Sequence, residues 1–192
     1  MPNHVTIEMT VSGDREAIME FAESHFVANT NPDRNAWEDE CFFEFSTIIP
    51  MPACMHGTTS PTPEADKLNA RIRQKMYGAS NWYDWSINNW GTKWGAYDVD
   101  ANFDRVELDG CAVVRFQTAW SLPEPIFAEL ADLYPELTFE IRCCEEGGFF
   151  AGELTYTGGE VIDNLVGEEG WDMYAAEFYG YDLDEDGKII YD

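Results

Sequence analysis

The residues best suited to metal chemistry form an acidic string near the end of the sequence. Positions 1, 3, 5, 6 and 8 of an EF-hand calcium loop are matched by Asp182, Asp184, Asp186, Gly187 and Ile189. Position 12 of that loop, a bidentate glutamate, would fall at residue 193, beyond the given sequence. We therefore interpret the string as a solvated acidic turn between short strands, in which Gly187 has positive φ. Weak calcium binding is the alternative.

Ligands of the zinc type are few. Cys54 and His56 are the one close pair, and the adjacent Cys143 and Cys144 lack the spacing of zinc ligands. His25 falls on the apolar face of a predicted helix, so we expect it to be a packed histidine. The sequence therefore predicts no metal site and no cofactor.

Motifs of catalysis are also missing from the sequence. It contains no Gly-x-Ser-x-Gly elbow, no phosphate-binding loop of the Gly-x-x-x-x-Gly-Lys type and no Gly-x-Gly-x-x-Gly fingerprint. Carboxylate pairs are so common among 37 Asp and Glu residues that no pair stands out. We predict that the protein is not an enzyme, and an acidic enzyme without a recognisable motif is the weakest alternative.

The acids dominate the composition. The 192 residues include 37 acids and 11 Lys and Arg, which gives a net charge of −26, although 45% of the residues are hydrophobic and can form a core. Such a charge argues against direct binding of nucleic acid and of anionic membranes. Residues 1–96 carry a net charge of −6 and residues 97–192 carry −20, so the excess lies in the second half.

Three groups of acids, called here the acidic knots, stand out in this half. Aromatic residues lie among them in the sequence, and we predict that the knots bind a basic partner while these rings anchor the region. The knots are Glu145 and Glu146; Glu168, Glu169 and Asp172; and Asp182, Asp184, Glu185 and Asp186. The alternative is that the acids only keep the surface soluble.

The charge density decides whether such a surface can resemble DNA. A globular chain of this size exposes roughly 9,300 Å² by the surface-scaling rule, which spreads the charge to roughly one per 360 Å². Duplex DNA carries roughly one charge per 110 Å². If the −20 of the second half occupied a third of the surface, the density would reach about one charge per 155 Å². Mimicry of DNA therefore requires the acids to lie on one side.

Four tryptophans lie within the segment from Asn81 to Asp98, NWYDWSINNWGTKWGAYD. We expect the tryptophans to fill a gap beside the sheet, with a glycine turn and a cation–π contact between lysine and tryptophan. An aromatic binding surface is the alternative. The signature residues are Trp82, Trp85, Trp90, Gly91, Lys93 and Trp94.

The string Asn89-Trp90-Gly91-Thr92-Lys93-Trp94, preceded by the two other tryptophans, resembles the hallmark of the YubB-like ferredoxin-like family of phage and plasmid proteins. The resemblance implies a protein of a mobile element with a ferredoxin-like core. It supplies no catalytic residues.

The elements that must position these residues follow from the hydrophobic patterns. Helices are predicted after an Asp14 cap, over residues 64–77 and over residues 123–133. Lys67, Arg71 and Lys75 share one face of the second helix, which can be solvated or can contact acids of this chain or of a second copy. Strands are predicted over residues 4–12, 40–50, 105–120 (a hairpin or a bulged strand), 137–144 and 149–156.

This order predicts the α+β class, a ferredoxin-like antiparallel sheet with helices on one face. We expect one domain over residues 1–160, with an inserted helix and Trp-rich segment over residues 50–98. Residues 161–192 are expected to be an acidic, aromatic C-terminal extension packed on that domain.

The functional prediction combines the charge, the missing motifs and the resemblance. Five cysteines without a repeated pattern and no leader-like start indicate reduced thiols and the cytoplasm of a bacterial host cell. We predict a phage or plasmid accessory protein that inhibits a basic host defence or nucleic-acid-binding protein through a DNA-like acidic surface. The main alternative is a module that self-associates through the Trp-rich segment and the basic helix.

Overall fold

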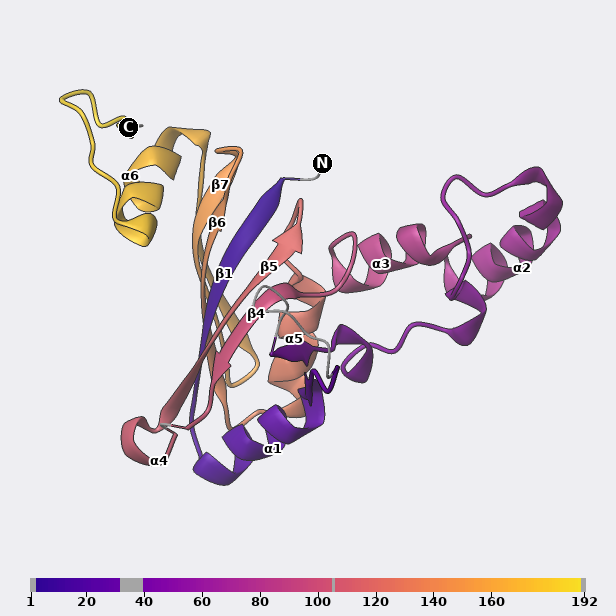
Figure 1. Ribbon diagram of the computed structural model, residues 1–192, viewed down its shortest axis with the longest axis horizontal. Helices are drawn as coiled ribbons and strands as arrows, with labels where there is room; N and C mark the ends of the chain where they lie inside the picture. Colours follow the sequence, from indigo (N-terminus) through magenta and orange to yellow (C-terminus); the bar gives the residue numbers. More distant parts are fainter. Residues whose placement is uncertain (1–2, 32–39, 105, 191–192) are drawn as a thin grey trace.

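One six-stranded antiparallel sheet with the order β4-β5-β1-β6-β7-β8 organises the computed structural model, which describes residues 3–31, 40–104 and 106–190 (Figure 1). The protein therefore has the predicted α+β fold. The strands are β1 (His4–Ser12), β4 (Tyr97–Asn102), β5 (Cys111–Ala119), β6 (Thr138–Glu145), β7 (Phe150–Thr157) and β8 (Glu160–Gly167).

The first four strands of the sheet order form the ferredoxin-like unit. In chain order the unit is β1, α1 (Arg15–His25), β4, β5, α5 (Glu124–Leu133) and β6, which is the β-α-β-β-α-β pattern. β7 and β8 extend the sheet beyond β6 through two further antiparallel pairings. The predicted ferredoxin-like core is thus confirmed, and it continues past residue 160 into β8.

The core lies between the sheet and the helices α1 and α5. Every second residue of β1 points to that side, and all four of its apolar side chains there are 0% exposed. Asp14 caps α1 as predicted, since its carboxylate accepts the backbone N–H groups of Glu16 and Ala17 at 2.9 and 3.3 Å. Full burial of residues such as Phe21 and Phe127 contributes about 1.5–3 kcal/mol each. The opposite side of the sheet is called here the open face.

The strand predicted over residues 40–50 is wrong. Only β3 (Cys41–Phe43) is extended, and it pairs with β2 (Phe26–Ala28) in a separate two-stranded sheet. The chain then turns in a 3₁₀ helix over Phe45–Thr47. The apolar run reflects burial of Phe43, Phe45 and Ile48 in the core, and a continuous apolar run does not by itself distinguish a strand from a buried turn.

The hairpin predicted over residues 105–120 is also different. Val106–Asp109 is a single helical turn, α4, and Gly110 has φ 67°, so β5 starts only at Cys111. The hairpin partner of β5 is β4, whose first two residues belong to the Trp-rich segment. β4 therefore takes the place in the ferredoxin-like unit that residues 40–50 were expected to fill.

The insertion forms an arm that projects away from the sheet (Figure 1). Its helices are α2 (Lys67–Tyr77), which follows a 3₁₀ turn over Glu64–Asp66, and α3 (Trp82–Trp90). Residues 50–63 contain only a short 3₁₀ turn over Ala53–Met55. The predicted inserted helix is confirmed, and α3 is a second helix that the sequence pattern did not predict.

Candidate functional site

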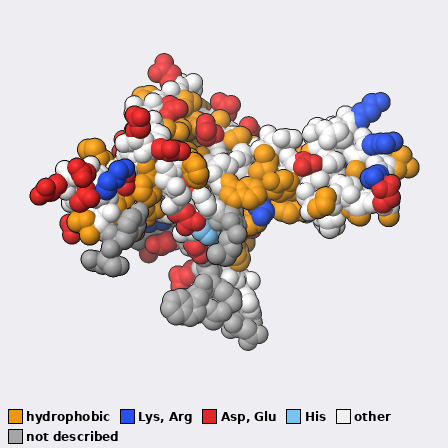
Figure 2. All heavy atoms as spheres, turned by 90° about the horizontal axis from the view of Figure 1, so that it is seen from above, with side chains coloured by type: hydrophobic (Ala, Val, Ile, Leu, Met, Phe, Trp, Pro, Cys, Tyr) orange, Lys and Arg blue, Asp and Glu red, His pale blue; other side chains and the backbone are white. Residues whose placement is uncertain are grey.

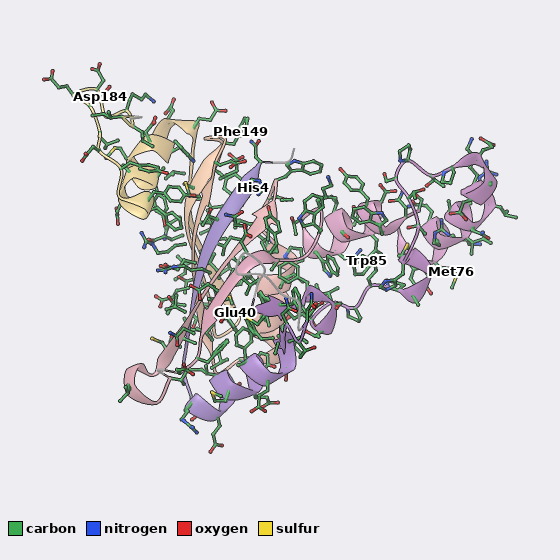
Figure 3. All side chains as sticks on the ribbon, in the orientation of Figure 1. His4, Glu40, Met76, Trp85, Phe149 and Asp184 are labelled. Carbon is green, nitrogen blue, oxygen red and sulfur yellow. The ribbon has the colours of Figure 1, made fainter. Side chains whose placement is uncertain are left out.

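The three acidic knots meet at one end of the molecule, called here the acidic end. The first knot is the turn between β6 and β7, the second opens α6 (Glu168–Tyr179), and the third is the turn after α6. The Trp171 indole N–H donates to the Glu145 carbonyl at 2.7 Å and joins the first two knots. Lys188 pairs with Asp172 at 2.5 Å and joins the last two. Figure 3 shows Phe149 and Asp184 at this same end.

Glu145 does not belong to the exposed acidic surface, where the sequence predicted it. Its residue is 2% exposed, and its carboxylate accepts the backbone N–H of Phe149 at 3.1 Å. It closes the turn between β6 and β7. A surface role was wrong for this residue because the last position of β6 faces the core side of the sheet, opposite Val5.

Glu146, the next residue, is exposed and belongs to the surface. One of its carboxylate oxygens accepts the backbone N–H of His4 at 2.9 Å, and its own N–H donates to the His4 carbonyl at 3.0 Å. These bonds tie the turn to the start of β1, so the position of this carboxylate is fixed.

The second knot lies in the first turns of α6. Glu168 and Glu169 are exposed, and Gly167 at the N-cap offers no side-chain cap, so the two carboxylates lie where the helix dipole favours negative charge. Asp172 is partly covered, and the hydrogen bond from Lys188 lowers the pKa of this carboxyl. Asp172 therefore remains ionised at neutral pH.

The third knot is a turn of the predicted kind. Leu183 and Ile189 form a bridge, and Gly187 has φ 75°. One carboxylate oxygen of Asp184 accepts the backbone N–H groups of Asp186 and Lys188 at 3.0 and 2.8 Å. The turn is thus organised by hydrogen bonds, and its acids at 182–186 are all exposed.

Metal ligation finds no support in the described parts of the chain. Within residues 3–31, 40–104 and 106–190, no three His, Cys, Asp or Glu side chains are grouped so that they can hold a metal ion. Cys143 and Cys144 are buried, and desolvation raises their thiol pKa to about 12 and about 11. His25 is packed as predicted, at 4% exposure. No helix in the described residues is long and apolar enough to span a membrane.

A row of alternating charges crosses the open face, and the sequence pattern did not predict it. Glu8 in β1 accepts from Arg115 in β5 at 2.7 Å and lies 3.7 Å from Arg142 in β6. Arg142 reaches Glu153 in β7 at 3.7 Å and lies over the rings of α6. The row follows from the strand register, which sets Arg115, Glu8, Arg142 and Glu153 opposite one another. The alternation of β1 already placed Glu8 off the core, but no local signal named its partners.

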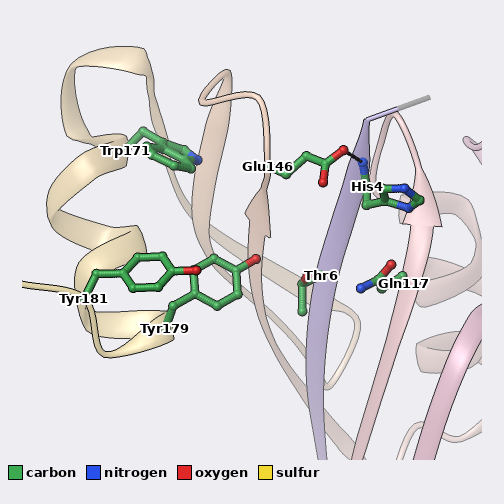
Figure 4. A pocket seen from close by; sticks show the side chains of 7 residues that line it. All are labelled: His4, Thr6, Gln117, Glu146, Trp171, Tyr179 and Tyr181. Atoms are coloured by element: carbon green, nitrogen blue, oxygen red, sulfur yellow. Dashed lines mark hydrogen bonds between the residues drawn. The ribbon is translucent and has the colours of Figure 1, made fainter. Parts of the chain in front are cut away.

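A pocket of about 290 Å³ lies where the open face meets α6 (Figure 4). Trp171, Tyr179 and Tyr181 line one side, and Glu146 and Gln117 lie across from them. Desolvation raises the pKa of Tyr179 to about 12, so its hydroxyl stays protonated. The sequence indicated these rings as anchors and Glu146 as a surface acid, and the structure brings them together.

The signature tryptophans divide between core and surface. Trp85 and Trp90 are buried and pack edge to face at 5.4 Å, and the Trp90 indole N–H donates to the Ile49 carbonyl at 2.9 Å. Gly91 has φ 80°, and a Cβ there would lie 2.9 Å from the Pro125 ring. The burial of the two tryptophans and the turn at Gly91 both agree with the prediction that this segment packs beside the sheet.

The partly exposed signature residues form a second, smaller cluster. The Lys93 ammonium lies 4.3 Å from the Trp94 ring centroid and 4.8 Å from that of Trp120. Trp82 is half-buried at the start of α3. The predicted cation–π contact is present, and Trp120, which lies outside the Trp-rich segment, provides a second ring.

The bases gather on the arm. Figure 2 shows Lys and Arg side chains at its far end beside a few acids, whereas Asp and Glu side chains are scattered among hydrophobic and other side chains over the body of the molecule. Arg73 is buried and bonded to Asp66 and to the Ser80 carbonyl, so it holds the arm together. Lys67, Arg71 and Lys75 are exposed on α2, and Lys67 forms an ion pair with Glu64 of the same chain.

One family model and one solved structure match this chain. Residues 89–191 match the family model described as the ferredoxin-like domain in Api92-like protein. The crystal structure of the protein Api92 from Yersinia pseudotuberculosis is similar with a TM-score of 0.50, covering 87% of this chain and 98% of that chain. The two sequences are 8% identical, so this similarity concerns the fold alone. No curated protein matches the sequence.

Proposed function

The chain belongs to the family that shares the ferredoxin-like domain of Api92-like proteins, and from this premise we propose that its acidic end binds a basic protein in the manner of DNA. The partner class is a host defence or nucleic-acid-binding factor with a basic groove, and the effect is blockade without turnover. The origin in a phage or plasmid is part of the proposal and rests on the resemblance of residues 89–94 to the YubB-like family.

The convergence of the three knots carries this proposal. The three knots contain nine acids, of which Glu145 is buried, and one base, Lys188, lies among them. The hydrogen bond from Trp171 and the ion pair of Lys188 hold the knots together, although up to 41 residues separate them in the sequence. Charge gathered in this way accelerates and orients the encounter with a positively charged groove.

Because the exposed surface is large, mimicry of DNA requires the acids to lie on one side of the molecule. The molecule exposes 11217 Å², more than a compact globule of its length, because the arm projects. Spread over that area, 26 net charges give one per about 430 Å², against roughly one per 110 Å² for duplex DNA. Only a concentrated patch approaches the density of DNA, and the acidic end brings together nine of the 24 acids of the second half.

Exposed apolar side chains lie among these acids. Phe149 is 61% exposed, Met173 69% and Tyr181 48%. A surface that served solubility alone would gain nothing from such side chains. A protein interface uses them, because desolvated rings hold a complex that charge has oriented.

The experiment is capture of partners from bacterial lysate at about 0.1 M and about 0.5 M salt, since screening separates charge-driven binding from other contacts. The test variant changes Asp182, Asp184 and Asp186 to Asn and Glu185 to Gln. The amide that replaces the Asp184 carboxylate keeps an oxygen that can accept the same two backbone N–H groups, so the turn is preserved. We expect a basic nucleic-acid-binding protein to be captured at low salt and lost with this variant.

A matched control removes the same charge from the far side of the sheet. It changes the exposed Glu20, Glu23, Asp132 and Glu136 of α1, α5 and the loop after α5 to Gln or Asn, and it retains the partner. The captured protein should also be released by duplex DNA. Equal loss with both variants, or a partner indifferent to DNA, contradicts the proposal.

Self-association through the arm is a second candidate function. Leu68, Ile72 and Met76 lie at i, i+4 and i+8 on α2 and are 71%, 51% and 64% exposed. Beside them, Arg71 and Lys75 make no ion pair within the described part of the chain. This apolar and basic face suits the acidic, partly apolar end of a second copy.

Sedimentation over a range of protein concentrations tests this candidate. Ile72→Glu and Met76→Glu together should convert an oligomer to a monomer. Leu108→Glu, at a site 81% exposed outside the arm, should not. A wild-type protein that is monomeric at all concentrations excludes self-association.

A further inference from the structure

We infer that the pocket beside α6 binds an arginine side chain, and this inference rests on the proposed binding of a basic protein. The pocket has a volume of about 290 Å³, just below the range of roughly 300–1,000 Å³ that is typical of sites for whole small molecules. A single side chain therefore fits its size better than a cofactor does.

The lining has the chemistry of a cation site. Trp171, Tyr179 and Tyr181 contribute aromatic rings, and Glu146 contributes a carboxylate. No Lys or Arg is among the lining residues, and the lining also includes the His4 imidazole, whose Nδ1 lies 2.7 Å from the Tyr97 hydroxyl oxygen. Ring faces attract cations through their quadrupole, and a carboxylate adds a charge-assisted hydrogen bond.

The carboxylate is held in place and keeps acceptor capacity for a ligand. One oxygen of Glu146 accepts the backbone N–H of His4 at 2.9 Å. An ionised carboxylate offers further lone pairs on both oxygens, and no other hydrogen bond to this group occurs in the described residues. In Figure 4 the side chain lies across the pocket from the rings, with its carboxylate directed toward His4.

The rings are also fixed. Trp171 donates its indole N–H to the Glu145 carbonyl at 2.7 Å, and the ring centroids of Tyr179 and Tyr181 are 5.4 Å apart. A guanidinium group is planar, is weakly hydrated and stacks on aromatic faces, whereas an ammonium is compact and strongly hydrated. The aromatic share of the lining therefore favours arginine.

Titration with two small probes tests the inference without any partner protein. N-acetyl-arginine amide carries the guanidinium, and N-acetyl-citrulline amide has nearly the same shape without the charge. The Trp171 indole N–H and the Gln117 side-chain amide report binding in nitrogen-15 NMR spectra. We expect the arginine probe to bind and the citrulline probe to bind at least about tenfold more weakly, as loss of a charged hydrogen bond predicts.

Two variants locate the site. Glu146→Gln keeps an acceptor for His4 but removes the charge, and it should weaken the arginine probe about tenfold. Tyr181→Leu removes a half-exposed ring and should weaken it several-fold. Glu185→Gln, an exposed acid of the third knot outside the pocket lining, should leave the affinity within about twofold of wild type.

Equal affinity for the two probes, no binding of the arginine probe, or an equal loss with Glu146→Gln and Glu185→Gln overturns the inference. These outcomes are independent of the lysate experiment. If the pocket does not bind arginine, the acidic end can still capture a basic protein. If no basic protein is captured, the difference in affinity between the arginine and citrulline probes can still be measured.

Discussion

Replacement of His25 by Gln should remove a pH-dependent part of the free energy of unfolding. The imidazole is 4% exposed, with Nδ1 2.7 Å from the Thr47 hydroxyl oxygen and Nε2 3.0 Å from that of Tyr134. The Thr47 hydroxyl donates its hydrogen to the Glu44 carbonyl at 2.7 Å. It must therefore accept from Nδ1–H, which leaves Nε2 to accept from the Tyr134 hydroxyl. The folded protein therefore holds the His25 imidazole in its neutral form.

The sign and the size of the pH dependence of the free energy of unfolding follow from these hydrogen bonds. Burial lowers the pKa of His25 below its ordinary value of 6.5. The unfolded chain takes up a proton near pH 6.5, whereas the folded chain does so only at lower pH. The stabilisation of the fold by neutral His25 is therefore complete above the unfolded pKa of 6.5 and is lost as the pH falls toward the lower pKa of the folded state. The slope reaches about 1.4 kcal/mol per pH unit inside this window.

Urea unfolding followed by tryptophan fluorescence, at steps from about pH 7.5 to about pH 5.5, measures the effect. At the upper end the Gln variant should be less stable by about 1–3 kcal/mol, because two buried hydrogen bonds are disturbed. As the pH falls, the gap to wild type should narrow. Titration of the many carboxylates is shared by both proteins and cancels in the difference.

His56→Gln is the control, since His56 is exposed and its variant should follow the wild-type curve. A constant gap between wild type and His25→Gln at every pH would refute the proposed neutral ring. So would a gap that widens toward low pH, which would mean that the fold prefers the protonated form.

Three further substitutions test the fold around the site. Gly91→Ala should lower the free energy of unfolding by about 1–3 kcal/mol, because φ is 80° and the new methyl meets α5. Thermal melting checks this. The control Gly95→Ala, whose methyl would enter open space, should melt near the wild-type temperature. Glu8→Gln should cost about 1 kcal/mol in urea unfolding by removing the acid between two arginines, and Glu140→Gln, an exposed acid without an ion pair in the described residues, should cost less. Trp90→Phe should cost about 1–3 kcal/mol, because a backbone carbonyl loses its donor; an unchanged melting temperature would contradict this role of the indole.

The elements with a strong local pattern are the ones that the sequence alone predicts. β1 alternates strictly, Asp14 supplies a cap, and α5 has a full apolar face, so each of them is as expected. β8 was missed because it is an edge strand with most of its side chains exposed. α6 was missed because it buries only the small residues Ala175 and Ala176, which give little helical periodicity.

The candidate site divides in the same way. The sequence by itself determined that the second half carries the charge, that the acids form three knots and that aromatic residues lie among them. Only the tertiary structure decided that the knots adjoin, that Glu145 faces inward and that Glu146 closes a pocket with Tyr181. The physical reason is pairing across the sheet. Strand register brings together residues such as Glu8 and Arg142, 134 positions apart, and no local pattern encodes which strands become neighbours.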